Sequence, residues 1–404
     1  MSEPATPPPG PVPFTQRTGW DRSDNALSGE LGRARAEGRA LVDLTESNPT
    51  RAGLGGAELV TLLGDPRGAA YAPAALGHPE ARAAVARYYA DRGLVVPAER
   101  VCLSASTSEA YGWLFKLLCE RGDEVLIPAP SYPLFSFLAA LEDVTLVPYP
   151  LDRQRGFRVD LDALEAAVGP RTRAIVLVHP NNPTGSFLRR DEALAIEHLA
   201  RRHGLALIVD EVFGDYALGP LPPDRLPSFV GERQALTFVL SGLSKVAALP
   251  QVKLGWVVTL GPEALATEAL GRLEVIADTY LSVSTPVQLA LPAILARRGP
   301  IQEAIRARTG TNLRALDAAL LALGPHAPVR RLAVDGGWCA TLEVPRTRDE
   351  DAWVELLVRE EGVVVHPGYF FDFAEDGVLV VSLLAGEEAF REAIARVLKR
   401  VAEG

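Results

Sequence analysis

The sequence has few cysteines, no excess of positive charge and no long apolar run. Its 404 residues contain three cysteines, Cys102, Cys119 and Cys339, an odd number spread far apart. This spacing predicts neither a disulfide framework nor a Cys-x-x-Cys metal site, and it favours a reducing, cytoplasmic location. Charged residues or prolines interrupt every apolar stretch before the roughly 18 residues that a membrane span needs. No integral membrane protein is expected.

The N-terminus lacks the features of a targeting signal, and the whole chain lacks basic character. Residues 1–14 are rich in proline and have neither a basic region nor an apolar one, so we expect a flexible arm in place of a signal peptide. Asp and Glu number 51 against 41 Lys and Arg, a net charge of −10. Because nucleic acids and anionic membranes attract clustered Lys and Arg, neither is an expected partner.

The apolar pattern between residues 100 and 260 predicts a sheet covered by helices. Short apolar segments bounded by turn residues alternate there with longer helical patterns, which is typical of a largely parallel sheet. Several segments are apolar throughout, as expected for strands buried on both faces. The predicted strands are 101–103, 124–127, 145–148, 174–178, 205–209, 236–240 and 254–260.

The pattern after residue 300 differs and predicts a smaller α+β domain. Helical periodicity covers 301–323, 351–360 and 387–402, and strands are expected at 338–342 and 378–382. With hydrophobic residues at 48% and a length suited to two or three domains at roughly 150 residues each, the chain can bury a large core.

Polar motifs follow four of the predicted strands. Ligands of open α/β sheets bind beyond the carboxyl ends of the strands, so these motifs are the first candidates for a site. They read Ser-Ala-Ser-Thr-Ser-Glu-Ala at 104–110, His-Pro-Asn-Asn-Pro-Thr-Gly at 179–185, Asp-Glu-Val-Phe at 210–213 and Ser-Gly-Leu-Ser-Lys at 241–245.

Two residues of these motifs suit carbanion chemistry. Lys245 ends an apolar strand, an interior location unusual for a solvated lysine, and can form a Schiff base with an aldehyde cofactor and then move a proton. Asp210 can keep a pyridinium nitrogen protonated. From the residues alone, a role for Asp210 as a helix or turn cap is equally open.

Taken in this order, the four motifs resemble the fold-type-I pyridoxal-phosphate enzymes, and within them the class I/II aminotransferases, from about Leu41 to the C-terminal helix. The resemblance implies an α/β fold with a large, mostly parallel-sheet domain and a smaller α+β domain. The implied division is an N-terminal arm and small-domain portion (1–55), a large cofactor-binding domain (56–295) and a small C-terminal domain (296–404). It further implies pyridoxal 5'-phosphate as cofactor and a homodimer with shared active sites.

The same resemblance assigns roles to single residues. Lys245 becomes the Schiff-base lysine, Asp210 the partner of the pyridine nitrogen, Asn182 the donor to the phenolic oxygen and Tyr132 the aromatic that stacks on the ring. Tyr71 resembles the tyrosine that reaches the phosphate of the neighbouring subunit. The expected phosphate site opens a helix, where backbone N–H groups and hydroxyls converge, and comprises Ser106, Thr107, Ser108, Ser244 and Lys253, with Ser241 as a further hydroxyl.

The sequence also departs from the family pattern, at two positions expected to bind the cofactor and at one expected to bind the substrate. Phe213 stands where many relatives have a tyrosine, and Lys253 stands where they have an arginine, so a point charge replaces a bidentate fork. Val380 occupies the position of the arginine that binds the substrate carboxylate. Two explanations stay open: Arg51, close to Asn48, is a relocated anchor, or the substrate has no α-carboxylate and Asn48, His366 and Tyr369 line a different pocket.

The expected reaction moves an amino group from an amino acid or amine donor to a 2-oxo acid. A β-eliminating lyase or a decarboxylase on the same fold is the main alternative, because the cofactor creates the carbanion and the surrounding pocket decides its fate. A cofactor-binding regulatory module would need an added DNA-binding domain, and no basic helix-turn-helix pattern is present.

Overall fold

The fold is built on one eight-stranded sheet and a smaller four-stranded one. The structure, a computed structural model, describes residues 13–23 and 26–404, so most of the expected arm at 1–14 lies outside the described residues. The large sheet has the order β2-β9-β8-β7-β6-β3-β4-β5. Its strands are β2 (Val101–Ser104), β3 (Glu124–Ala129), β4 (Thr145–Asp152), β5 (Arg158–Val159), β6 (Thr172–Val178), β7 (Ala206–Asp210), β8 (Thr237–Gly242) and β9 (Gly255–Leu260).

The direction of these strands decides where the polar motifs meet. Strands β4, β3, β6, β7 and β8 are parallel to one another, whereas β9 runs antiparallel to both β8 and β2. Strand β2 therefore points the same way as β8. The carboxyl ends of β2, β6, β7 and β8, which carry the four motifs, lie at one edge of the sheet.

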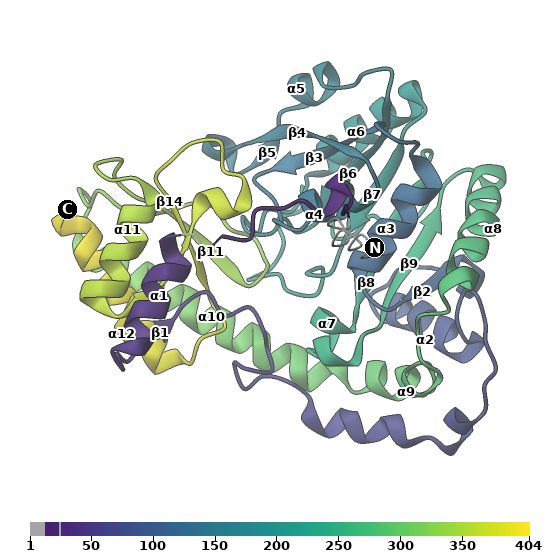
Figure 1. Ribbon diagram of the computed structural model, residues 1–404, viewed down its shortest axis with the longest axis horizontal. Helices are drawn as coiled ribbons and strands as arrows, with labels where there is room; N and C mark the ends of the chain where they lie inside the picture. The colour runs from purple at the N-terminus through teal and green to yellow at the C-terminus, as the bar shows by residue number, and fades with distance from the viewer. Residues whose placement is uncertain (1–12, 24–25) are drawn as a thin grey trace, which may run out of the picture.

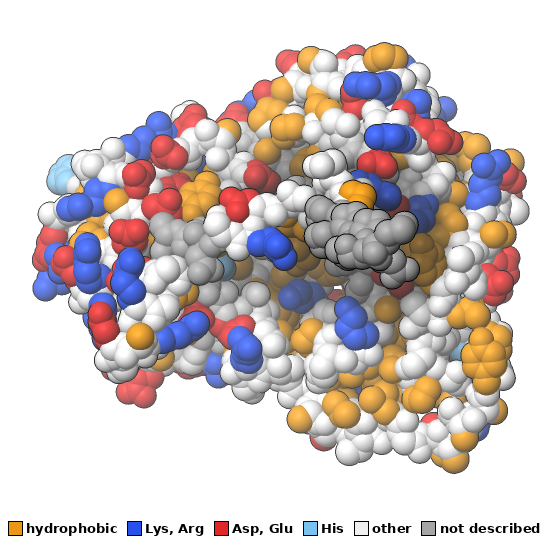
Figure 2. All heavy atoms as spheres, viewed as in Figure 1, with side chains coloured by type: hydrophobic (Ala, Val, Ile, Leu, Met, Phe, Trp, Pro, Cys, Tyr) orange, Lys and Arg blue, Asp and Glu red, His pale blue; other side chains and the backbone are white. Residues whose placement is uncertain are grey.

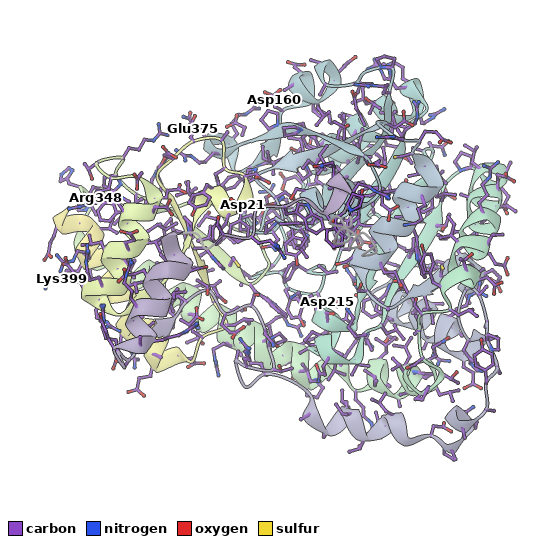
Figure 3. All side chains as sticks on the ribbon, in the orientation of Figure 1. Asp21, Asp160, Asp215, Arg348, Glu375 and Lys399 are labelled. Carbon is purple, nitrogen blue, oxygen red and sulfur yellow. The ribbon has the colours of Figure 1, made fainter. Side chains whose placement is uncertain are left out.

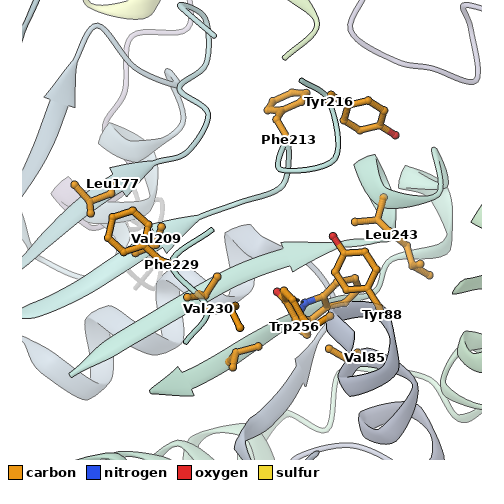
Figure 4. Packing of buried hydrophobic residues seen from close by; sticks show 14 of the residues in the cluster. Val85, Tyr88, Leu177, Val209, Phe213, Tyr216, Phe229, Val230, Leu243 and Trp256 are labelled. Atoms are coloured by element: carbon orange, nitrogen blue, oxygen red, sulfur yellow. Dashed lines mark hydrogen bonds between the residues drawn. The ribbon is translucent and has the colours of Figure 1, made fainter. Parts of the chain in front are cut away.

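Helices cover both faces of the large sheet, which explains why its central strands are apolar throughout. Alternate side chains of β6 point to opposite faces: Ile175 and Leu177 pack with α2, α6 and α9, and Ala174 and Val176 pack with α3, α4 and α8. Figure 4 shows part of the first of these cores, with Leu177 and Val209 on neighbouring strands. The covering helices are α2 (Pro79–Ala90), α3 (Thr107–Leu118), α4 (Phe135–Leu141), α6 (Arg190–His203), α8 (Glu263–Tyr280) and α9 (Thr285–Ala296).

The smaller part lies beside the large sheet at the left of Figure 1 and has a core of its own. Its sheet has the order β10-β11-β14-β13, and a separate parallel pair joins β1 to β12. The strands are β1 (Val42–Asp43), β10 (Arg330–Arg331), β11 (Cys339–Glu343), β12 (Val363–Val364), β13 (His366–Pro367) and β14 (Val378–Ser382). The helices are α1 (Ala26–Ala36), α10 (Arg298–Leu323), α11 (Glu350–Leu356) and α12 (Glu387–Glu403).

Two segments bridge the parts. Helix α10 runs from the large part to the small one, where it packs along α12 (Figure 1). The N-terminal segment before α1 reaches α4, where Trp20 packs edge-on against Phe137 at 5.3 Å between ring centroids. Short helical turns complete the chain: η1 (Gln16–Thr18), η2 (Ala57–Gly64), η3 (Pro66–Ala69), η4 (Ala98–Arg100), η5 (Arg153–Arg155), α5 (Leu161–Ala166), α7 (Leu243–Val246), η6 (Pro250–Val252), η7 (Leu357–Glu361) and η8 (Gly368–Phe371).

The predicted elements match the observed ones in order and type, with differences at their ends. Lys245 lies in the single-turn helix α7 and not at the end of a strand, because β8 stops at Gly242 and its chain turns there. The helix expected at 351–360 is divided into α11 and the π-helical turn η7, which ends at Gly362 with φ of 62°. Within 13–23 and 26–404, no helix is long and apolar enough to cross a membrane.

Candidate active site

The four polar motifs gather at the edge of the large sheet that faces the smaller part. This face is hollowed between the two parts in Figure 2, and Lys and Arg side chains border the hollow. Gly255, at the start of β9, lies between two of the motifs: a Cβ built on it would meet the backbone of Ser106 at 3.1 Å and the carbonyl oxygen of Ser241 at 3.2 Å. A side chain at position 255 would therefore separate the start of α3 from the end of β8.

Lys245 lies among aromatic rings. Its Nζ is 4.7 Å from the centroid of the Trp338 ring and 5.3 Å from that of Phe213, and no described residue forms a hydrogen bond with it. Burial lowers the pKa of Lys245 to about 8, an effect that the charge of Asp210 partly opposes. Because the pKa is near neutrality, the amine can exchange a proton under physiological conditions.

A buried polar network fixes the backbone that carries Lys245. The hydroxyl of Tyr216 donates to the Lys245 carbonyl oxygen, and Gln302 of α10 donates to that of Val246 at 2.9 Å. Gln302 also donates to Asp215 at 3.0 Å, and Asp215 accepts a second hydrogen bond from the hydroxyl of Tyr88 at 2.9 Å. Asp215 is labelled close to α7 in Figure 3, and Figure 4 shows Tyr88 and Tyr216. The loop that carries Asp215 and Tyr216 and helix α10 thus hold the backbone of α7, and Tyr88 of α2 supports that loop.

Asp210 ends β7 and is buried with two donors. Its Oδ1 accepts from the backbone N–H of Val212 at 3.0 Å, and its Oδ2 accepts from the hydroxyl of Tyr111 at 3.3 Å. Burial raises the pKa of Asp210 to about 6, although both hydrogen bonds and the charge of Lys245 lower it. No described arginine pairs with the carboxylate, which leaves it able to pair with a cationic ligand group.

The start of α3 offers donors for an anion. Ser106 is the N-cap of this twelve-residue helix, and its hydroxyl accepts from the backbone N–H of Glu109 at 3.1 Å. The hydroxyls of Thr107, Ser108 and Ser244 have no partner in the described chain. The Ser241 hydroxyl is buried without a hydrogen-bond partner there. Lys253 is exposed, in a left-handed backbone conformation with φ of 60°, and forms no ion pair with any described residue.

Asn182 and Tyr132 lie on two loops that are tied together. The side-chain amide of the neighbouring Asn181 donates to the carbonyl oxygen of Pro130 at 3.2 Å, and its Oδ1 accepts from Thr184. Asn182 itself is only partly buried, and its amide finds no partner among the residues described. Tyr132 is 38% exposed, and burial together with the nearby charge of Asp210 raises its pKa. Asn181 therefore shapes the loop, and Asn182 is left available.

The residues predicted for the substrate lie on the small-sheet side and are held differently. The loop 45–51 is attached to the end of β14, where the Ser382 hydroxyl donates to the Glu46 carbonyl oxygen at 2.6 Å. The Asn48 side chain accepts from the backbone N–H and hydroxyl of Thr50 at 3.0 and 2.7 Å. The Arg51 side chain is 78% exposed and lies 3.7 Å from the Glu46 carboxylate. The structure does not bring Arg51 into contact with Lys245 or Asp210.

The other substrate candidates are engaged in the fold. Val380 is 1% exposed and packs in an apolar cluster with Phe371 and Val378. Tyr369 donates its hydroxyl to Asp351 at 2.8 Å. The Nδ1 atom of His366 is buried without a partner in the described chain, and burial lowers the pKa of this imidazole.

Tyr71 stands apart from the other predicted residues. It is 82% exposed and belongs to a surface hollow that Trp113, Ser282 and Gln288 also line. Its hydroxyl forms no hydrogen bond with the described residues of its own chain.

The residues at the sheet edge fit pyridoxal phosphate chemically. The cofactor offers an aldehyde, a ring nitrogen, a phenolic oxygen and a phosphate. Among the described residues, the amine of Lys245 and the amide of Asn182 have no hydrogen-bond partner and suit the aldehyde and the phenolic oxygen, and the carboxylate of Asp210 suits the ring nitrogen. The hydroxyls and backbone N–H groups at the start of α3 suit the phosphate. The buried Ser241 hydroxyl without a partner adds a donor of the kind that a bound ligand satisfies.

Comparison with known proteins decides the family. The family model "Aminotransferase class I and II" matches residues 47–397. The chain belongs to this family. The glutamate-pyruvate aminotransferase AlaA of Escherichia coli K12 is 31% identical to it over 288 residues, which is 68% of each chain. The arginine-pyruvate transaminase AruH of Pseudomonas aeruginosa PAO1 is 30% identical over 314 residues, 77% of each chain.

Solved structures agree on the fold. Alanine aminotransferase from Pyrococcus furiosus superposes with a TM-score of 0.85 at 21% identity and covers 97% of this chain and 100% of its own. The predicted fold class, the pyridoxal phosphate cofactor and the aminotransferase activity of this class I and II aminotransferase are thereby confirmed.

Two residues that contact the candidate site were not predicted from the sequence. Tyr111 donates to Asp210 from within a helix whose neighbouring residues are apolar, and Trp338 packs on Lys245 from just before β11. The available signal for Tyr111 was a hydroxyl on the buried face of α3, which a core tyrosine also presents. For Trp338 the sequence offered only a bulky residue before a strand.

Proposed function

We propose that the chain transfers an amino group from an amino acid or amine donor to a 2-oxo acid, with Lys245 as the residue that binds the cofactor aldehyde and moves the α-proton. The observation that carries the proposal is the placement of a free lysine amine with a pKa of about 8 at the same sheet edge as a buried aspartate. Bound pyridoxal phosphate supplies an electron sink for the carbanion of the substrate. Asp210 supports it by holding a positive charge on the ring nitrogen.

The remaining predicted residues bind and orient the cofactor in this proposal. With the cofactor bound, Asn182 would donate to the phenolic oxygen, and Tyr132 would pack against the ring. The N–H groups and hydroxyls at the start of α3 would bind the phosphate, and Lys253 would add a point charge. Phe213 lies beside Lys245 and has no hydroxyl, so Asn182 serves the phenolic oxygen without a second donor from that position.

For the substrates, we propose that pyruvate and alanine form one of the two pairs. Three relatives support it: a glutamate-pyruvate aminotransferase, an arginine-pyruvate transaminase and the alanine aminotransferase of Mycobacterium tuberculosis. Because Val380 offers no cation, we propose Arg51 as the carboxylate partner. A guanidinium that is exposed and lies 3.7 Å from Glu46 can exchange that carboxylate for one on the substrate.

The test is product analysis of the purified holoenzyme. The protein is incubated with alanine, glutamate or arginine, with and without a 2-oxo acid, and the keto acids, amino acids and ammonia are measured. A transaminase consumes donor only in proportion to the acceptor and releases no ammonia. Ammonia together with a keto acid in the absence of an acceptor identifies a lyase, and carbon dioxide with an amine identifies a decarboxylase. If amino transfer occurs with other 2-oxo acids and not with pyruvate, the proposed substrate pair is wrong, although the chain is still an aminotransferase.

We also propose a homodimer that works in the cytoplasm, with the division into segments 1–55, 56–295 and 296–404. The exposed Tyr71, which has no partner in the described part of its own chain, suits a contact with the phosphate of a second subunit. Three cysteines without disulfides suit a reducing compartment. Light scattering of the holoenzyme tests the dimer, and Tyr71→Phe should weaken cofactor binding if the hydroxyl crosses the interface.

A further inference from the structure

The strand register explains why Tyr111 meets Asp210. Successive side chains of β7 point to opposite faces, so Asp210 shares a face with Ala206 and Ile208, and this is the face that α3 covers. Tyr111 lies on the buried side of α3 with Ala110 and Leu114. One helix therefore supplies both the candidate phosphate site at its first residue and, one turn later, a donor to the aspartate.

The tyrosine is locked in place by its neighbours. It is 2% exposed, and its ring packs edge-on against Phe135 at 5.1 Å and tilted against Phe115 at 6.1 Å between centroids. Burial, followed by the charge of Asp210, raises the pKa of the Tyr111 hydroxyl well above its ordinary value. The hydroxyl consequently stays protonated and acts as a donor to the carboxylate.

The two hydrogen bonds on Asp210 leave room for a third. An ionised carboxylate has about four lone-pair positions on its two oxygens, of which the Val212 N–H and the Tyr111 hydroxyl use one each. Donors on both oxygens fix the rotation of the carboxylate and favour its charged form. An aspartate with only the backbone hydrogen bond could still rotate its carboxylate group.

We propose that Tyr111 is a positioning residue that orients the Asp210 carboxylate and keeps it ionised for the ring nitrogen of pyridoxal phosphate. The proposal rests on the role of Asp210 given under the proposed function. Tyr111 does not touch the reacting atoms and acts through the aspartate alone. Its effect should therefore disappear whenever the bond between Asp210 and the ring nitrogen is absent.

The test uses Tyr111→Phe, which removes the hydroxyl and keeps the ring that packs on Phe135. Apoprotein is titrated with pyridoxal phosphate and with an analogue that has carbon in place of the ring nitrogen, and the dissociation constants are compared. We expect Tyr111→Phe to raise the dissociation constant for pyridoxal phosphate about tenfold. For the carbon analogue we expect no change.

Tyr149→Phe is the matched control. Tyr149 is equally buried, and its hydroxyl donates to the Val176 carbonyl oxygen at 2.7 Å in the same sheet and not to Asp210. Its variant should lose stability without a preference between the two ligands. Equal losses for both ligands in Tyr111→Phe, or no loss for either, would overturn the proposal.

A second variant separates failure of this inference from failure of the Asp210 assignment. If Asp210→Asn leaves the affinity for pyridoxal phosphate unchanged, the aspartate does not serve the ring nitrogen and the underlying role is wrong. If Asp210→Asn weakens binding and Tyr111→Phe does not, only the role of Tyr111 is wrong. In the Asp210→Asn background, Tyr111→Phe should have no further effect on cofactor affinity. Because a general loss of stability would weaken binding in either background, this comparison keeps the test valid if Tyr111→Phe is destabilised.

The pH dependence provides a readout that loss of packing would not produce. The titratable groups that face Asp210 are Tyr111 from α3, Lys245 from α7 and Tyr132 from the loop after β3. Loss of the Tyr111 bond raises the pKa of Asp210, so the variant takes up a proton at a higher pH. The ratio of the variant to wild-type dissociation constants should grow as the pH falls from 8 towards 6. A ratio that is constant over this range would contradict the proposal.

Discussion

The two sides of the active site are built by opposite means. On the large-sheet side, Lys245, Asp210 and the start of α3 present unpaired or chargeable polar groups at the ends of parallel strands. On the small-sheet side, Val380 is buried among Phe371 and Val378, and the cationic candidate for a substrate carboxylate is the exposed Arg51. The cofactor side keeps the four motifs and departs from the family pattern at Phe213 and Lys253, whereas the substrate side lacks the usual arginine altogether.

This difference shows which half of the chemistry the family determines. Pyridoxal phosphate is the same molecule in every relative, so the residues that bind it are constrained by its groups. A substrate side without the usual arginine has to select its ligand by other means. Membership in the family therefore establishes the reaction class of this chain, while the substrate has to be determined by experiment.

The largest effect is expected on the cofactor side from Lys245→Ala. Loss of the amine removes both the attachment of the cofactor and the base, so kcat should fall by at least about 10³-fold. Steady-state kinetics with saturating cofactor measure it. Lys116→Ala is the control, because Lys116 is a lysine of the same large part that pairs with Glu142 at the surface. Retention of more than a few percent of the activity in Lys245→Ala would mean that another residue is the base.

The substrate side should resist restoration of the family arginine. Val380→Arg would place an unpaired guanidinium in the cluster of Phe371 and Val378, so the free energy of unfolding should fall by about 3 kcal/mol or more. Urea denaturation of the holoenzyme measures it. The same replacement at Leu321, which is 83% exposed on α10, should change stability by less than about 0.5 kcal/mol. If Val380→Arg folds normally and binds carboxylates more tightly, a single side chain accounts for the departure of the substrate side from the family pattern.

The sequence could place the candidate cofactor residues at one edge of the sheet because these residues follow strands. The carboxyl ends of parallel strands meet at one edge, so Asp210 and the motif at 241–245 could be placed together although they are separated in the chain. Tyr111 could not be found in this way. Its contact with Asp210 spans 99 residues and depends on which face of α3 packs on which face of β7, which is a property of the folded core.

The substrate side could be predicted only by what it lacks. The absence of arginine at position 380 was visible in the sequence, but the closing of that position by Phe371 arises from the pairing of β14 with β11 and β13. The contact of Trp338 with Lys245 depends likewise on how the smaller part meets the large sheet. Packing between the two parts leaves no periodic signal in either segment.

A smaller effect is expected from pH on the apoprotein. Lys245 has a folded-state pKa of about 8, below its ordinary value, so the unfolded chain binds more protons above pH 8 and stability should rise with pH there. Asp210 has a raised pKa of about 6, so its contribution to stability should fall as the pH increases towards 6. Thermal unfolding of wild type, Lys245→Met and Asp210→Asn, measured below pH 6 and above pH 8, gives the slope of stability against pH that each group contributes. A slope unchanged by its own substitution would show that the corresponding group is not buried in the apoprotein.

The smallest effect is expected from Arg51, and it decides how far the two sides differ. Arg51→Ala should raise the KM for a carboxylate donor about tenfold and leave kcat nearly unchanged, because a guanidinium pair of this kind contributes about 1.5 kcal/mol. Arg51→Lys keeps the charge without the bidentate fork and should give an intermediate KM. Steady-state kinetics with alanine and with an amine that lacks the carboxylate separate the cases, since the amine should be indifferent to both variants. An unchanged KM for alanine in Arg51→Ala would leave the carboxylate without a cationic partner on this loop and would favour a donor recognised through apolar contacts around Val380.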